Sequence, residues 1–184
     1  MIMNNEKHHG CCGHSSRCEQ IHDSVPIHSC ERGKCGGCCK SKCGGITITR
    51  SDLEILNELL EYNYLPISRF VMCSSHTDEA RFIALAPVYI DDKTDSIEIV
   101  KLFGEQLNAM EKKNLISLDY DDALQGYDYE KHRNSDLFHY FEKTVKEGAG
   151  KSDYLCDTAE LECGSISMTP FGLAAAKHYF GDIE

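Results

Sequence analysis

Cysteine is concentrated at one end of this chain, and that distribution limits what the chain can fold into. Eight of the eleven cysteines and five of the nine histidines lie in residues 1–45, which contain few large apolar side chains. A stretch of this composition cannot bury enough apolar surface to fold alone, whereas bonds to a metal ion can supply the missing free energy. We therefore expect two domains, a Cys/His-rich metal-dependent segment over residues 1–45 and a globular body over residues 46–184.

The strongest motif in the segment is Cys35-Gly-Gly-Cys38. Its C-x-x-C spacing lets two thiolates bind one ion, and the glycines permit the tight turn between them. Neighbouring side chains complete a four-ligand set, and a second group lies nearer the amino terminus. The candidate metal ligands are His28, Cys30, Cys35, Cys38, Cys39 and Cys43, together with Cys11, Cys12, His14 and Cys18.

Zinc is the cofactor that these ligands predict, because it takes four Cys or His ligands tetrahedrally. An iron–sulfur cluster is the alternative, since Cys30, Cys35 and Cys38 have the spacing of plant-type [2Fe–2S] loops, although a matching fourth cysteine is not visible. The chain starts without the apolar region of a secretory signal, which predicts a cytoplasmic protein. In that reducing compartment, an odd number of cysteines favours metal or redox chemistry over disulfides.

The body is strongly acidic. Residues 46–184 hold 13 Lys/Arg against 26 Asp/Glu, a net charge of −13, whereas residues 1–45 hold six against four, a net charge of +2. Phosphate binding depends on Lys and Arg, so this balance disfavours nucleic acid as a partner of the body. The chain also lacks the roughly 20 consecutive apolar residues of a membrane helix, so no membrane partner is expected.

Helical and strand periodicities alternate along the body and predict an α+β fold. A capping box, Ser51-x-x-Glu54, is expected to start the first helix, and Thr169-Pro170 the last one. The predicted helices cover residues 52–62, 66–75, 96–113, 135–148 and 171–180, and the predicted strands cover 81–90, 115–120 and 160–168.

Two short motifs carry a resemblance to a known family. Leu107-Asn-Ala-Met-Glu-Lys-Lys-Asn-Leu-Ile116 and Met168-Thr-Pro-Phe-Gly172 resemble the helix–turn–strand and second-wing-strand–helix junctions of winged-helix domains in bacterial regulators. The resemblance implies a winged-helix-like body with insertions, namely the strand at 81–90 and the region 121–159 inside the wing. It also implies that the helix over 96–113 is the recognition helix. The residues that would then contact DNA are Lys101, Gln106, Asn108 and Lys112.

These observations lead to two functional interpretations. The first is a metal- or redox-responsive winged-helix transcriptional regulator that binds DNA, with a homodimer as one possible form. The alternative is a metal-handling or protein-interaction adaptor that does not bind nucleic acid, and the acidic body favours it. An enzyme is not predicted, because no nucleophile, base and orienting group can be placed together. The best candidates for a nucleophile and a base are Cys73 and His76. A cysteine in the core next to a histidine on the surface is more common than such a catalytic pair.

Overall fold

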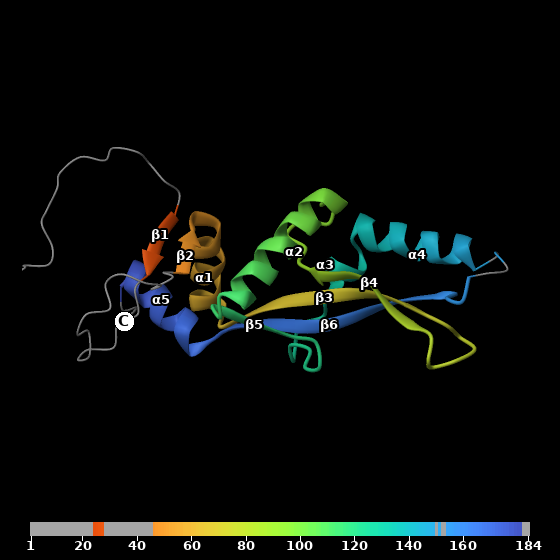
Figure 1. Cartoon of the computed structure of the whole chain (residues 1–184). Coiled ribbons are helices and arrows are strands. Elements are labelled where there is room, and N and C mark those ends of the chain that lie inside the picture. Colours follow the sequence, from red (N-terminus) through yellow and green to blue (C-terminus); the bar gives the residue numbers. More distant parts are fainter. Residues whose placement is uncertain (1–23, 28–45, 150, 152–153, 182–184) are drawn as a thin grey trace, which may run out of the picture.

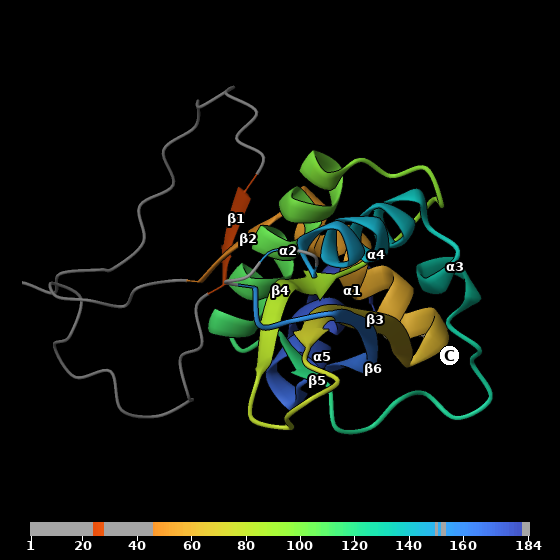
Figure 2. The same cartoon turned by 90° about the vertical axis from the view of Figure 1, so that its right-hand side faces the viewer.

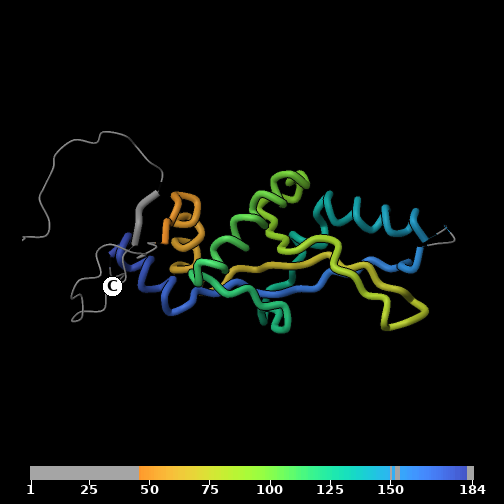
Figure 3. The backbone as a smooth tube through the Cα atoms, in the orientation of Figure 1, coloured from red at the N-terminus to blue at the C-terminus, as the bar shows by residue number. Residues whose placement is uncertain are grey.

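The computed structural model describes residues 24–27, 46–149, 151 and 154–181, and it confirms the predicted α+β class. Four antiparallel strands form the main sheet in the order β4-β3-β6-β5. Their bounds are β3 (Tyr64–Cys73), β4 (Arg81–Val88), β5 (Ile116–Asp119) and β6 (Thr158–Met168). Strands β3 and β6 run side by side along most of the molecule (Figure 3).

Helices cover one side and one end of this sheet. Helices α2 and α4 lie on the same side of it, and α1 and α5 pack together at one end (Figures 1 and 2). The helices are α1 (Arg50–Tyr62), α2 (Ile97–Lys112), α3 (Glu130–Arg133), α4 (Asp136–Gly148) and α5 (Pro170–Phe180). A separate two-stranded sheet joins β1 (Ser24–Ile27) to β2 (Ile46–Thr49), which precedes α1. Among the described helices, none combines the length and apolar composition of a membrane span.

One predicted element is wrong. The sequence predicts a short helix over 66–75, but residues 66–73 of this stretch belong to β3. Both faces of the strand are covered, so Phe70 and Val71 are each 1% exposed and Ser68 is fully buried. Burial on both faces removes the alternation of polar and apolar residues that identifies a strand in a sequence.

The other predicted elements are present with small shifts at their ends. The predicted helices at 96–113, 135–148 and 171–180 correspond to α2, α4 and α5, whose N-caps are Ser96, Ser135 and Thr169. The strand expected at 81–90 is β4, which lies between α1 and α2 in the chain and pairs with β3. Strands β5 and β6 correspond to the strands predicted at 115–120 and 160–168 and pair antiparallel, with α3 and α4 in the region between them.

The first helix starts two residues earlier than the predicted capping box. Thr49 is its N-cap and Asp52 closes the box, because the Asp52 carboxylate accepts a hydrogen bond from the Thr49 N–H at 3.0 Å. The same carboxylate pairs with Lys113 Nζ at 2.6 Å, and Asp52 is only 2% exposed. Asp52 therefore caps α1 and ties it to the end of α2.

Two apolar clusters fill the space between the helices and the sheet. The larger cluster joins α1, α2 and α5 to the sheet, and the smaller one lies where α2 and α4 meet Phe70 of β3. Phe70 packs against Phe138 and Phe141 of α4, with ring centroids 5.1 and 5.2 Å apart. The larger cluster includes Leu56, Leu59, Ile67, Leu107, Met110, Leu115, Ile166 and Ala176.

The start of α5 fits closely against the turn between α2 and β5. The Thr169 N–H donates to the Leu115 carbonyl at 3.1 Å, and the Thr169 hydroxyl accepts from the Gly172 N–H at 2.9 Å. A Cβ on Gly172 would lie 1.9 Å from the Leu115 oxygen. Only glycine fits at position 172. The two motifs that carry the family resemblance therefore contact each other through Leu115 and Gly172.

We predict that Gly172→Ala destabilises the protein by about 3 kcal/mol, because the added methyl group meets backbone that cannot move aside. Urea unfolding monitored by circular dichroism measures the change. Ala174→Ser, on the exposed side of the same helix, is the matched control and should cost no more than about 0.5 kcal/mol. Equal stability of the two variants would contradict the close approach of α5 to Leu115.

Asp52→Ala is expected to cost about 3 kcal/mol, because it removes one of the two hydrogen bonds of the capping box and leaves the Lys113 ammonium without its buried partner. The measurement is again the free energy of unfolding in urea. Glu54→Ala is the control. It breaks the exposed ion pair between Glu54 and Arg50 on the same helix, and should change stability by less than about 0.5 kcal/mol. A small effect of Asp52→Ala would show that the capping box and ion pair contribute little.

Candidate functional site

The predicted metal ligands lie outside the described residues. This holds for both groups, His28, Cys30, Cys35, Cys38, Cys39 and Cys43, and Cys11, Cys12, His14 and Cys18. Within the part of the chain that the structure describes, no three His, Cys, Asp or Glu side chains converge in a way that could hold a metal ion. The zinc site and its iron–sulfur alternative remain predictions from spacing.

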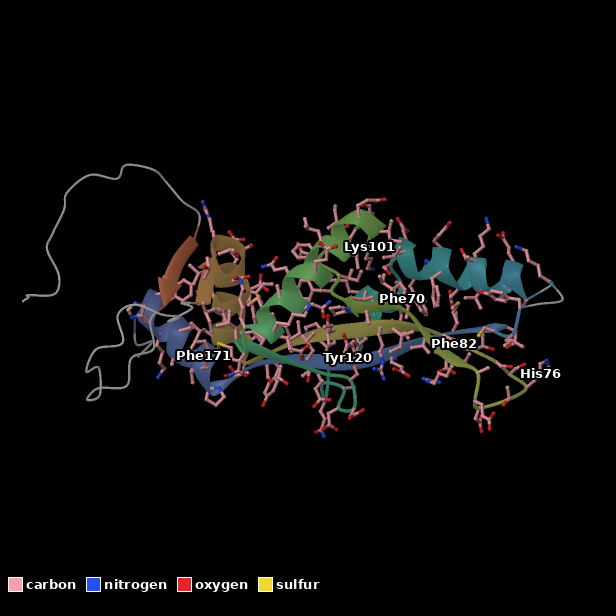
Figure 4. All side chains as sticks on the ribbon, viewed as in Figure 1. Phe70, His76, Phe82, Lys101, Tyr120 and Phe171 are labelled. Carbon is pink, nitrogen blue, oxygen red and sulfur yellow. The ribbon has the colours of Figure 1, made fainter. Side chains whose placement is uncertain are left out.

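The residues predicted to contact DNA lie on α2, where three of the four share one face. Lys101, Asn108 and Lys112 are seven and four residues apart, a spacing that aligns them along one side of a helix. Lys101 and Lys112 are exposed and Asn108 is half-buried, and Figure 4 marks Lys101 near the start of α2. Gln106 falls off this face, and its buried Nε2 has no hydrogen-bond partner in the described structure.

Acidic and apolar side chains accompany these lysines. The exposed charged residues of α2 are Glu98, Lys101, Glu105, Glu111 and Lys112, three acids against two bases. Three exposed apolar side chains, Ile97, Ile99 and Leu102, lie on the first turns of the same helix. The exposed surface of α2 is therefore slightly negative, unlike the basic surface that phosphate groups attract.

The arginines of the sheet are paired with carboxylates. Arg69 of β3 and Arg81 of β4 both donate to Glu162 of β6, and Arg81 also contacts Glu160 at 2.8 Å. Arg69 also lies over the ring of Tyr120, with the guanidinium carbon 4.8 Å from its centroid. Side chains alternate along a strand, so Arg69 faces away from the side where its neighbour Phe70 packs against α4.

The pKa of Glu162 shows how strongly this network holds its charges. Burial alone would raise that pKa, but hydrogen bonds and charge from Arg81 and Arg69 outweigh burial and hold it below the usual value. The carboxylates in turn raise the pKa of Arg81. Sequence reasoning missed this network, because Arg69 and Glu162 are 93 residues apart and only strand pairing brings them together.

Cys73 and His76 do not form a nucleophile–base pair. Cys73 is 6% exposed, and burial raises the pKa of its thiol although Arg81 Nη1 lies 3.2 Å from the sulfur. The side chain of His76 is 88% exposed, and its closest charged neighbour is Asp157 at 3.9 Å. Cys73 is therefore a protonated core thiol, a weak nucleophile.

His132 in α3 is the most unusual polar side chain that the structure describes. It is fully buried, and neither ring nitrogen has a hydrogen-bond partner among the described atoms. Burial lowers the pKa of His132 to about 4, and the neighbouring Lys131 acts in the same direction. The imidazole is therefore neutral near pH 7, and its ring packs at 5.7 Å from the ring of Tyr129.

The comparisons with known proteins add no relative. No family model, curated protein or solved structure matches the chain.

We predict that His132 makes folding stability depend on pH. An unfolded chain protonates this side chain near pH 6.5, whereas the folded chain resists protonation until about pH 4. Unfolding therefore gains protons, and about 3 kcal/mol of stability is lost as the pH falls from 6.5 through 4.

Urea unfolding at a series of pH values tests this contribution. His132→Phe should flatten the pH dependence over that window relative to the unchanged protein. His139→Asn, a change at an exposed histidine of α4, should leave it unaltered. Identical pH profiles for the His132→Phe variant and the parent would show that His132 is not the source.

Proposed function

We propose that this protein is a metal-dependent adaptor in which residues 1–45 bind zinc and the body binds a partner protein rather than nucleic acid. The observation that carries the proposal is that several cationic side chains of the body form ion pairs within the chain. Arg50, Arg69, Arg81, Lys113 and Lys143 each pair with a carboxylate of the same chain.

These pairs remove cations from the set that could neutralise phosphate. Arg69 and Arg81 are held by Glu160 and Glu162, and Lys113 by the buried Asp52. Moving such a cation to a phosphate would leave a carboxylate unpaired, which is costly where the carboxylate is buried. The net charge of −13 over residues 46–184 acts in the same direction at longer range.

The zinc part of the proposal rests on the C-x-x-C motif and its neighbours. Cys35 and Cys38, with two further ligands from His28, Cys30, Cys39 and Cys43, supply the four donors of a structural site. Binding would convert a segment with few apolar residues into a folded one.

A second candidate is the metal-responsive winged-helix regulator. The shared face of Lys101, Asn108 and Lys112 on α2 favours it, as does the antiparallel pairing of β5 with β6 after that helix. The acids on the same helix weaken it, because Glu98 and Glu105 would face the DNA backbone together with the lysines.

We predict that the full chain, purified without oxygen, is colourless and contains stoichiometric zinc by elemental analysis. Replacing both Cys35 and Cys38 by serine should remove the zinc, because it takes two of the four ligands from one site. Cys163→Ala, in β6 of the body, is the control and should keep the metal. A brown protein that contains iron and sulfide would show that the segment holds an iron–sulfur cluster in place of zinc. A protein that contains no metal and binds none on titration would contradict the proposal.

We predict that the zinc-loaded chain does not shift a pool of random-sequence DNA duplexes on a gel, at low or at moderate salt. The acidic body repels the phosphates, and the repulsion is strongest at low salt. A shift that is lost in the Lys101→Ala, Lys112→Ala double variant and kept in Lys146→Ala, a lysine of α4, would replace the adaptor by the regulator.

A further inference from the structure

Two grooves meet where α1 ends and β3 begins. The first, called here the apolar groove, is lined by Tyr62, Tyr64, Met168, Pro170 and Leu173 among others, and has a volume of about 570 Å³. The second, called here the acidic groove, has a volume of about 620 Å³ and includes Asp119 and Asp122. Tyr64 and Ser167, which are paired across β3 and β6, line both grooves, so the two grooves adjoin each other at these residues.

Two tyrosines on either side of Asn63 line the apolar groove. Asn63 caps α1 in the left-handed region, with φ of 64°, and its N–H donates to the Leu59 carbonyl at 3.0 Å. Tyr62 therefore ends the helix and Tyr64 starts the strand, and they remain 60% and 54% exposed. Large exposed tyrosines beside a groove are typical anchor points for a partner protein.

Carboxylates border both grooves. Asp119 and Asp122 line the acidic groove, and a hydrogen bond to Glu61 with the nearby charge of Glu58 raises the pKa of Tyr62 at the apolar groove. Among the described residues that line either groove, there is no lysine or arginine. The acidic groove, which two aspartates line, is therefore more negative than the apolar groove, which no carboxylate lines among the described residues.

We infer that the two adjoining grooves bind a segment of a partner protein in which an apolar side chain lies within a few residues of lysine or arginine. Charge complementarity decides the occupant, because the carboxylates attract a basic segment and repel an acidic one. The apolar groove has the volume of a typical ligand pocket and suits a side chain such as Leu or Phe. This inference rests on the proposed adaptor function and names the chemistry of its partner.

A labelled peptide tests the inference with the zinc-loaded full chain. The probe is fluorescein-Gly-Ser-Leu-Phe-Gly-Lys-Arg-Lys-Gly, and its binding is followed by fluorescence anisotropy at low salt. Two matched peptides carry serine in place of Leu-Phe, or glutamate in place of the three basic residues. Each should bind at least about tenfold more weakly than the probe, because each removes one of the two contacts.

Variants locate the binding surface. The Tyr62→Ser, Tyr64→Ser double variant should weaken the probe about tenfold, and Asp119→Asn with Asp122→Asn should weaken it and reduce its salt dependence. Asparagine keeps the acceptor oxygen with which Asp119 holds the following turn through the Asp121 N–H. Tyr140→Ser and Glu142→Gln, at exposed positions of α4, are the matched controls and should bind the probe normally.

Backbone amide spectra of the ¹⁵N-labelled chain provide an independent map. Titration with the probe should shift the signals of Tyr64, Asp122, Ser167 and Leu173. Shifts centred on Ile99 and Leu102 of α2 would overturn the inference. So would equal binding by the double tyrosine variant and the Tyr140→Ser control, or no binding by any probe with Leu, Ile, Met, Phe or Tyr at the apolar positions.

The peptide and DNA experiments together distinguish a failure of the groove assignment from a failure of the adaptor proposal. Failure of the probes in a chain that holds zinc and leaves DNA unshifted overturns the groove assignment alone. A DNA shift that depends on Lys101 and Lys112 overturns the adaptor proposal itself.

Discussion

The ladder between β3 and β6 is the constraint on which the rest of the structure depends. It pairs ten residues of each strand without interruption, from Tyr64 opposite Ser167 to Cys73 opposite Thr158. One end of the ladder supports the cluster formed with α1 and α5, and its middle carries Phe70 against α4. The same register places Arg69 opposite Glu162 and Tyr64 opposite Ser167, the two residues that line both grooves.

Electrostatics follows from this register. An acidic body could have left its arginines available to an anionic partner, but strand pairing places Glu160 and Glu162 beside Arg69 and Arg81. The unsatisfied negative charge then lies elsewhere, on exposed acids such as Asp119 and Asp122 at the edge of the sheet. Negative charge of this kind attracts cations and repels anions, whether or not the body has a winged-helix fold.

Local signals predicted most of the fold. Ser96, Ser135 and Thr169 precede apolar repeats, and each caps a helix in the structure, because capping and periodicity are decided within a few residues. Strand β3 was not predictable in this way, since its burial on both faces comes from partners distant in the chain. The pairing of Arg69 with Glu162 and the meeting of Tyr64 with Ser167 depend on register, which no local pattern carries. The predicted metal ligands rest on local spacing alone, and they lie outside the described residues.

The place of α3 and α4 between β5 and β6 has a consequence for how the chain folds as it is made. Strand β4 follows β3 closely and can pair with it at once, but β6 emerges from the ribosome only after about 85 further residues. Until then one edge of β3 has backbone N–H and C=O groups without a neighbouring strand, and an open strand edge invites pairing with another chain. Non-local pairing of this kind also slows folding. During that interval, a chaperone that covers residues 64–73 of the nascent chain would prevent this pairing with other chains.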